Sequence, residues 1–292
     1  MSFSQDVKSE LCRVPCPQTC CMACETAAAL LVGAHPAGEG RVAISTENAA
    51  FASRLFRHVK SLADRHPDVG HARERNLRKH MLYHIILPEE TARILAENRA
   101  TEETCCRKAY LRGVFLTGGS MIHPEKGYHL ELTCPSVRTA GKIAARLKAF
   151  HLNGGIAERN GSYFVYLKEA ENIVDFLNLV GAHQALLTFE NVRILKGMRN
   201  QVNRIVNCET ANLDRTASAS RRQRACIEAL AAAGRLTKLP PALREIAELR
   251  LENPEMSLED LGKMATPAIG KSGVNHRLRT IVRIAGRMET AP

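Results

Sequence analysis

The sequence predicts an α+β fold in which a tandem duplicated α+β domain is followed by a small all-α helix-turn-helix domain. Three observations predict it. The first 185 residues contain an internal repeat, the last 60 carry only helical patterns, and the basic charge is concentrated toward the C-terminus. Residues 1–192 hold 23 Lys and Arg against 20 Asp and Glu, whereas residues 193–292 hold 18 against 10. An uneven basic excess of this kind favours binding to a polyanion.

Length and composition narrow the class of protein. The 292 residues suit one large domain and one small one, with mainly aliphatic cores, since there are no Trp, 5 Tyr and 8 Phe. The N-terminal residues MSFSQDVKSELCR have no apolar stretch behind a basic start. The longest apolar run, residues 27–34, is too short to cross a bilayer. We therefore expect a cytoplasmic protein that makes no membrane contact.

The repeat consists of two units, over about residues 18–100 and 103–185, which together form a predicted domain over 1–190. At an offset of 85, CCMACETAAALLVGA aligns with CCRKAYLRGVFLTGG, with apolar positions matched throughout. At an offset of 88, RVAISTENAAFASRLFRHVKSL aligns with HLELTCPSVRTAGKIAARLKAF. Two matched units in tandem predict a pseudo-symmetric domain.

Both units show the same order of elements. Each begins with a helix that ends in Gly, continues with an alternating strand and an amphipathic helix, and closes with a second strand and a last helix. The residues that carry this pattern are Val42, Ile44, Leu55 and Val59 in the first unit and Leu130, Leu132, Ile143 and Leu147 in the second. The second strands are predicted at 81–87 and 162–167, and the last helices from Glu89 and Glu169.

A basic helical connector is predicted over residues 191–234. Ile194, Met198, Val202 and Ile205 recur at helical spacing, and the segment TASAS at 216–220 predicts a break before another helix. Residues 193–224 contain eight basic and two acidic residues. This excess favours phosphate contacts; a solvated face without a partner is the alternative. The predicted contacts are Arg221, Arg222 and Arg224.

Residues 235–292 form the predicted helix-turn-helix domain. Its first helix, ALREIAELRLEN, is ended by Pro254, and Ser257 caps a short helix with an apolar face at Leu258, Leu261 and Met264. Thr266-Pro267 and Gly270 interrupt the chain before a last helix over residues 271–288. A short helix, a turn and a longer basic helix are what a helix-turn-helix requires.

The last helix has two predicted faces. Val274, Leu278, Ile281 and Ala285 face inward, and the core of the motif is assigned to Leu258, Leu261, Val274 and Leu278. The outward residues suit double-stranded DNA, because Asn pairs with adenine, Arg pairs with guanine and cations bind phosphates. The predicted contacts are Lys271, Ser272, Asn275, His276, Arg277 and Arg279. A protein-interaction bundle is the alternative.

The ten cysteines are expected to act mainly as small buried apolar residues. The cluster Cys12, Cys16, Cys20, Cys21 and Cys24 has only loose spacing, whereas a zinc or iron–sulfur site favours two tight pairs. No metal and no cofactor are therefore expected, although metal binding by the 12–24 cluster stays open.

Long segments of the chain resemble the WhiA family of bacterial regulators. They are MSFSQDVKSEL, YLRGVFLTGGSMIHPEKGYHLEL, MRNQVNRIVNCETANLDRT and LPPALREIAELRLENPEMSLEDLGKMATPAIGKSGVNHRLR, and the resemblance covers essentially the whole chain. It implies a degenerate LAGLIDADG homing-endonuclease-like domain followed by a helix-turn-helix similar to sigma-factor region four. It also implies a nucleoid-associated transcription regulator with a role in cell division, chromosome segregation or sporulation. Through its N-terminal domain, such a protein would contact another regulator or the transcription machinery.

In active homing endonucleases the LAGLIDADG helix ends in an acid that binds a catalytic metal. The resemblance places that position at Gly118, and the repeat places it at Gly33. We expect Gly113 and Ala28, together with these glycines, to let two helices approach closely. Glu39 and Glu125, with His35 and His123, are nearby loop residues for which solvent exposure is the expected state, and Glu131 is placed on a strand. The prediction is therefore a non-enzymatic, sequence-specific DNA-binding protein; a residual endonuclease and a protein-interaction adaptor are the alternatives.

Overall fold

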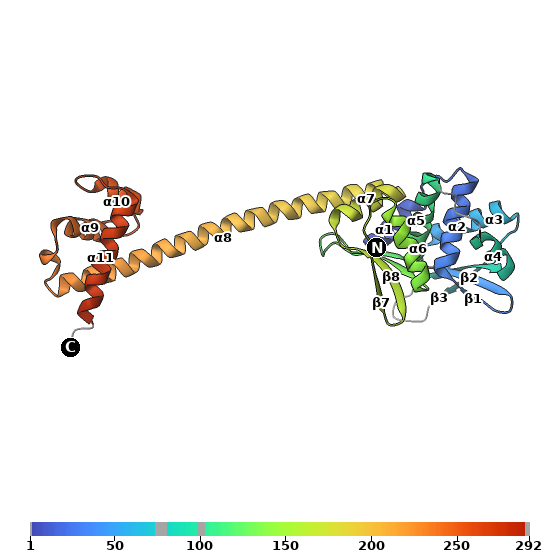
Figure 1. The fold of residues 1–292 in the computed structure, drawn as a ribbon, viewed down its shortest axis with the longest axis horizontal. Coiled ribbons are helices and arrows are strands. Elements are labelled where there is room, and N and C mark those ends of the chain that lie inside the picture. Colours follow the sequence, from blue (N-terminus) through green and yellow to red (C-terminus); the bar gives the residue numbers. More distant parts are fainter. Residues whose placement is uncertain (1, 74–80, 98–102, 290–292) are drawn as a thin grey trace. The chain divides into compact units, whose positions relative to one another are not determined.

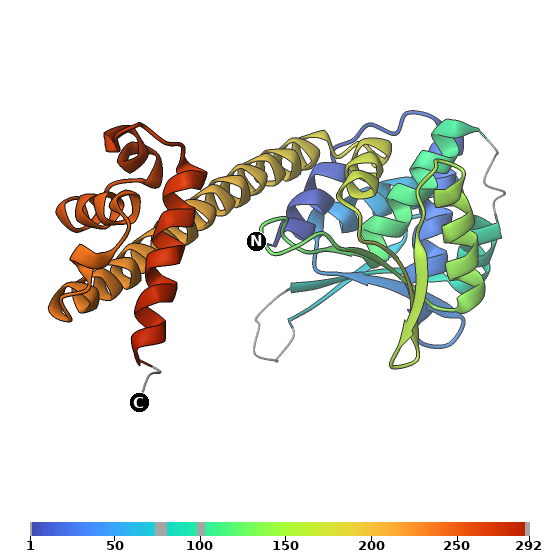
Figure 2. The same cartoon turned by 60° about the vertical axis from the view of Figure 1, so that its left-hand side comes forward.

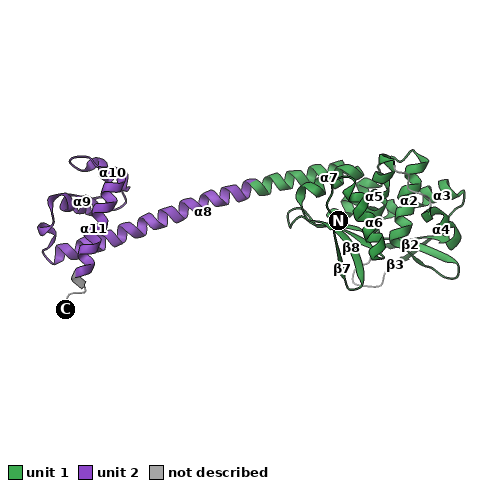
Figure 3. Cartoon of the chain, in the orientation of Figure 1, with its two compact units in different colours: residues 1–197 green, residues 198–292 purple. Residues whose placement is uncertain are grey.

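The computed structural model describes residues 2–73, 81–97 and 103–289. It divides into two compact units, residues 1–197 and 198–292 (Figure 3). This single division differs from the predicted domain limits after residues 190 and 234. The ends of the predicted first repeat and last domain, residues 98–100 and 290–292, lie outside the described residues. Among the helices described, none combines the length and the apolar character needed to span a bilayer.

The duplication predicted in unit 1 is confirmed by its topology. After α1 (Phe3–Leu11), each repeat forms a four-stranded antiparallel sheet, in the orders β1-β2-β4-β3 and β5-β6-β8-β7. The first repeat contains α2 (Thr19–Gly33), β1 (Ala34–Pro36), β2 (Arg41–Thr46), α3 (Ala49–Ala63), β3 (Asp68–Arg73), β4 (Met81–Pro88) and α4 (Glu89–Glu97). The second contains α5 (Thr104–Gly118), β5 (Gly119–Met121), β6 (Leu130–Cys134), α6 (Val137–Lys148), β7 (Gly155–Arg159), β8 (Ser162–Leu167) and α7 (Ala170–Val180).

Sheet register brings the predicted apolar positions together. Ile44 of β2 lies opposite Ile85 of β4, and Leu132 of β6 lies opposite Val165 of β8. All four side chains are buried. The edge strands of both sheets were not predicted. The segments DVGHAR in β3 and GIAER in β7 lack a clear apolar alternation, and β1 and β5 are only three residues long.

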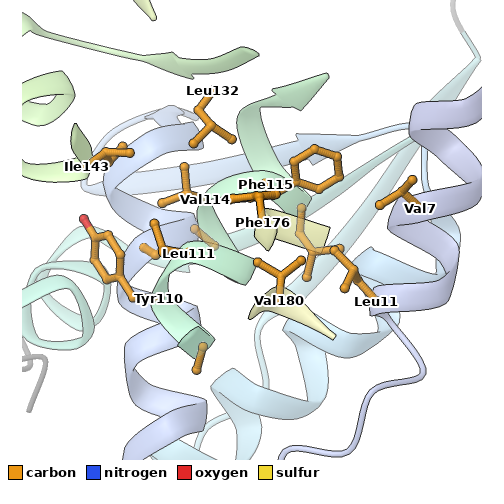
Figure 4. Packing of buried hydrophobic residues seen from close by; sticks show 14 of the residues in the cluster. Val7, Leu11, Tyr110, Leu111, Val114, Phe115, Leu132, Ile143, Phe176 and Val180 are labelled. Atoms are coloured by element: carbon orange, nitrogen blue, oxygen red, sulfur yellow. The ribbon is translucent and has the colours of Figure 1, made fainter. Parts of the chain in front are cut away.

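The core of unit 1 lies where α2 and α5 pack along each other on one side of the two sheets (Figures 1 and 2). Figure 4 shows Val114 and Phe115 of α5 beside Phe176 of α7, with Val7 and Leu11 of α1 closing one side. The rings of Phe115 and Phe176 are 5.7 Å apart. The helix α1, which the sequence analysis did not predict, therefore contributes directly to this core.

One helix, α8 (His183–Ala232), runs through the predicted connector up to its last two residues, which form a turn. The break predicted at 216–220 is wrong, because its Ala, Ser and Thr residues are compatible with a helix and the Thr216 hydroxyl donates to the Asn212 carbonyl at 2.9 Å. The helical spacing of Ile194, Met198 and Val202 is confirmed, but their side chains are 57–59% exposed. Beyond them, Ile227 and Leu230 are fully buried in the core of unit 2.

Unit 2 completes that core with η1 (Leu236–Lys238), α9 (Pro241–Glu252), α10 (Leu258–Met264) and α11 (Lys271–Glu289). Its buried residues are Ile227, Leu230, Leu239, Ile246, Ala247, Leu261, Ala265, Val274, Leu278, Ile281 and Ala285. The end of the predicted connector is therefore part of the helix-turn-helix core.

Candidate nucleic-acid interface

The short helix α10 begins as the sequence predicts. The Ser257 hydroxyl accepts a hydrogen bond from the Asp260 amide at 3.2 Å and donates to the Asp260 carboxylate at 2.8 Å. Lys263 also binds that carboxylate at 2.9 Å, and these hydrogen bonds lower the pKa of Asp260. Leu261 is buried and Leu258 packs partly against the core, whereas Met264 is 48% exposed. The assignment of Met264 to the apolar face is therefore wrong.

The segment before α10 is fixed by buried polar contacts. Arg250 of α9 is 2% exposed and donates to the carbonyls of Asn253, Pro254 and Met256, the last at 2.8 Å. Its burial lowers the pKa of Arg250. Ser220 of α8 donates to the Pro254 carbonyl as well. These bonds hold the entry to α10 against α8 and α9.

A close approach joins α10 to the turn that follows it. A Cβ on Gly262 would collide with the carbonyl oxygen of Ile269, and the Ile269 amide donates to the Gly262 carbonyl at 2.9 Å. Only glycine leaves room for this contact. The turn can therefore pass close to α10 before α11 begins at Lys271.

The two predicted faces of α11 are present. Val274, Leu278 and Ile281 are fully buried and Ala285 nearly so. On the opposite side Lys271, Ser272, His276 and Arg279 are exposed, and Asn275 is half-buried. Arg283, which sequence reasoning missed, is also exposed, four residues beyond Arg279 and hence on the same side. The four-residue spacing from Arg279 is the sequence signal that could have identified Arg283.

Arg277 lies apart from this outer face. It donates to the Ala242 carbonyl at 3.3 Å and lies 3.9 Å from the Glu245 carboxylate, both in α9. Glu245 in turn accepts the Thr266 amide at 2.6 Å. Arg277 therefore helps to fix α11 against α9, and its predicted phosphate contact remains a prediction.

Two predicted groups of residues meet in unit 2. Arg222 of α8 lines one hollow together with Asn275 and Arg279 of α11. A second hollow brings Lys271 together with Arg215 of α8. These pairs are more than 50 residues apart in the sequence, and their proximity follows from the packing of α8 against α11.

The connector arginines do not form one face. Arg221 and Arg224 line a separate hollow with residues 254–256. Arg224 also pairs with Glu228 at 3.3 Å, and Arg221 donates to the Ser218 hydroxyl at 3.2 Å. Arg222 is the connector arginine that lies beside the outer face of α11.

In unit 1, Gly33 and Gly118 end α2 and α5, as predicted. A Cβ on Gly118 would lie 2.8 Å from both the Thr133 carbonyl oxygen and Val32, and one on Gly33 would collide with Thr117. A Cβ on Gly113 would collide with the Glu25 carbonyl and lie 3.1 Å from Ala28. The close helix approach expected from these small residues is confirmed.

The nearby carboxylates do not gather at the helix ends. Glu39 and Glu125 are exposed, while Glu131 accepts from His129 at 2.7 Å and from Arg159 at 3.5 Å. His35 contacts the Ser45 hydroxyl at 3.1 Å, and His123 lies 3.9 Å from Glu125. Across the described residues, the one group of metal-ligating side chains found lies elsewhere, at Cys20, Cys21, Cys105 and Cys106. Cys20, Cys105 and Cys208 are exposed, so the expectation of buried thiols is wrong for these three.

The fold is a duplicated α+β domain followed by a helix-turn-helix, which is the domain order of a LAGLIDADG-like domain joined to a DNA-binding domain. Comparison with known proteins assigns all three parts to one family. Residues 19–99 match the WhiA N-terminal LAGLIDADG-like domain, residues 107–199 the WhiA LAGLIDADG-like domain, and residues 202–285 the WhiA C-terminal HTH domain. The chain belongs to the WhiA family.

Relatives of full length support this assignment. "Probable cell division protein WhiA" of Ruminiclostridium cellulolyticum is 43% identical over 99% of this chain and 98% of its own. The protein of that name from Alkaliphilus oremlandii is 44% identical, over 99% and 98%. The crystal structure of full-length DUF199/WhiA from Thermatoga maritima matches 98% of this chain and 99% of its own, with 29% identity and a TM-score of 0.63.

Proposed function

We propose that this chain is a non-enzymatic, sequence-specific protein that binds double-stranded DNA and regulates transcription. The observation that carries the proposal is the outer face of α11, where Asn275 and Arg279 share a hollow with Arg222 while the opposite face is buried. A helix packed on one side and polar and basic on the other suits insertion into a major groove.

Each residue of this interface has a role that its chemistry supports. Asn275 suits adenine and Arg279 suits guanine, because both side chains can form paired hydrogen bonds with base edges. Ser272 and His276 lie beside them and can donate to bases or to the backbone. Lys271, at the positive N-terminal end of α11, suits a phosphate.

The residues at the ends of α2 and α5 support the proposal that the protein does not cleave DNA. Phosphodiester hydrolysis with bound metal requires carboxylate ligands, and both of these positions carry glycine. At Gly118 the surrounding backbone also leaves no room for a side chain. Unit 1 is then a scaffold or a surface for another regulator or the transcription machinery.

The cellular role is inferred from the relatives, which carry the name of a probable cell division protein. We infer that this chain acts in the same process, through genes or chromosomal sites used in cell division, chromosome segregation or sporulation. A protein that binds such sites would be found on the nucleoid.

The first experiment measures the affinity of full-length protein for fragments recovered by footprinting on chromosomal DNA. Arg279→Ala should lose about 1–3 kcal/mol of binding free energy on such a fragment. Arg235→Ala is the matched control, since it removes one exposed positive charge outside α11. An equal loss in both variants would show that α11 does not read the sequence. Affinity that is independent of salt would favour the adaptor instead.

The second experiment tests catalysis with the unmodified protein. Supercoiled plasmid and linear DNA are incubated with it in Mg²⁺ and in Mn²⁺. We expect intact DNA and a shifted band on a gel. Nicking that copurifies with the protein and stops on addition of a chelator would contradict the proposal and favour the residual endonuclease.

A further inference from the structure

The two repeats bring four cysteines to one point in unit 1. Cys20 and Cys21 lie in the first turn of α2, and Cys105 and Cys106 occupy the equivalent positions in α5. The four sulfur atoms all lie within 4.8 Å of one another, and Sγ of Cys106 is 4.0 Å from Sγ of both Cys21 and Cys105. The pairs are 85 residues apart, which is the offset of the repeat.

We propose that Cys20, Cys21, Cys105 and Cys106 form a structural zinc site that joins the two repeats. No catalytic role follows from it. Cys20 lies 13 residues before Gly33 along α2, which is roughly 20 Å of helix from the position of the lost acid. The site lies in unit 1, whereas the DNA contact is proposed for α11 of unit 2.

The spacing of the sulfur atoms fits a single tetrahedral ion. A Zn–S distance of about 2.3 Å in a tetrahedron gives sulfur–sulfur distances of about 3.8 Å. Movements of less than about 1 Å would bring sulfurs that lie within 4.8 Å of one another to that geometry. Four thiolates without oxygen ligands favour Zn²⁺ over Mg²⁺ or Ca²⁺.

Without a cation, burial and the neighbouring Cys105 and Cys106 raise the pKa of the Cys21 thiol, so the ion itself would stabilise the thiolates. Two features of the surroundings would assist it. Both helices begin here, so two positive dipole ends face the sulfur atoms. At neither helix start does the N-cap side chain accept a hydrogen bond from the first turn, which leaves those amides available to sulfur. The Gln18 amide lies 3.3 Å from Sγ of Cys21 and can present its NH₂ group to a thiolate after a flip.

In each cysteine pair, the first residue is exposed and the second is buried. Cys21 and Cys106 are buried, whereas Cys20 and Cys105 are exposed. An ion can therefore enter from solvent and be held on its inner side by the core. Each repeat supplies one buried and one exposed ligand, so the ion would cross-link α2 and α5 without a disulfide.

The experiment measures metal in untagged full-length protein purified under reducing conditions. We expect about one zinc per chain by mass spectrometry, and replacement by Co²⁺ should give the sulfur charge-transfer and visible bands of tetrahedral thiolate coordination. Cys20→Ser and Cys105→Ser should each weaken zinc affinity at least ~10-fold, measured against a chromophoric chelator. These two positions are exposed, so the variants keep the core intact.

Matched controls separate the site from cysteine chemistry in general. Cys208→Ser removes an exposed thiol and Cys134→Ser a buried one, both away from the group of four. We expect both to retain the zinc. Substoichiometric metal after exposure to Zn²⁺, or wild-type affinity in Cys20→Ser and Cys105→Ser, would overturn the proposal. A Cys21–Cys106 disulfide that persists under these reducing conditions would do so as well.

Discussion

The two units use buried charge differently. In unit 1, Glu25 of α2 is 2% exposed and lies between Arg54, 2.8 Å from its Oε2, and Arg112 at 3.4 Å. Arg112 also donates to the Val180 carbonyl at 2.9 Å. In unit 2 the buried cation is Arg250, which is held by backbone carbonyls.

The two units therefore differ in whether their charged side chains are available to bind a ligand. The glycine ends of α2 and α5 carry no carboxylate, while the Glu25 carboxylate between the helices is engaged in structure. In unit 2, by contrast, Arg222, Arg279 and Lys271 remain on the surface. We conclude that the inward charge of unit 1 stabilises the fold, whereas the outward charge of unit 2 is free to bind a polyanion.

The largest effect is expected from breaking the ion pair in unit 1. Arg54→Met leaves Glu25 buried with weaker compensation and should lower the free energy of unfolding by about 3–5 kcal/mol. Tyrosine fluorescence in denaturant measures this change, because all five tyrosines lie in unit 1. Arg41→Ala is the control: it breaks the exposed Arg41–Asp68 pair, for which about 0–1 kcal/mol is expected. Equal losses would contradict a special role for the buried pair.

A somewhat smaller loss is expected in the aliphatic core of unit 2. Leu278→Ala creates a cavity between α11 and its neighbours and should cost about 3 kcal/mol. Helical circular dichroism should report the loss, while the tyrosine signal of unit 1 stays unchanged. Leu213→Ala, at a site that is 71% exposed, should change stability by about 0.5 kcal/mol or less. A shift of the tyrosine transition in Leu278→Ala would show that the two units unfold together.

The sequence predicted those features that depend on local periodicity. The inward residues of α11, the N-cap at Ser257 and the strands β2 and β6, one in each sheet, follow from spacing within a few residues. The features it missed depend on distant contacts. Glu25 and Arg54 are 29 residues apart, and the cysteine pairs become one group only when the repeats pack.

Two misjudgements have particular physical causes. The serines and alanines of 216–220 suggested a break, but α8 continues because Ser220 and Thr216 satisfy their hydroxyls on nearby carbonyls. The connector arginines suggested one basic face, but helical geometry places Arg222 away from Arg221 and Arg224. Charge counts along a sequence do not reveal this separation.

A third prediction uses the buried histidine beside the ion pair. His58 lies 3.7 Å from Glu25, and burial lowers its pKa from 6.5 to about 4, with Arg54, Arg57 and Arg112 adding to the effect and Glu25 opposing it. Below pH 6.5 the unfolded chain takes up a proton that the folded chain does not. Stability is therefore complete above that pH and falls as the pH decreases toward 4.

When the pH is lowered from 7 to 5, protonation of His58 in the unfolded chain should reduce the free energy of unfolding by about 2 kcal/mol. The measurement is tyrosine-monitored denaturation in EDTA, so that the proposed zinc does not contribute. His58→Gln should flatten the dependence over this range. The same pH dependence in His58→Gln would assign the effect to other groups.

The smallest effect is expected on DNA affinity when one exposed positive charge of unit 2 is removed. Arg222→Gln should weaken DNA binding on specific and unrelated fragments by a similar factor and reduce the slope of log affinity against log salt by about 1. Arg224→Gln is the matched control, because it removes the same charge two residues away, where Glu228 already pairs with it at 3.3 Å. Its salt slope should change less, since a paired arginine releases fewer counterions on binding. Equal slopes in the two variants would mean that the hollow shared by Arg222, Asn275 and Arg279 is not where the backbone of DNA lies.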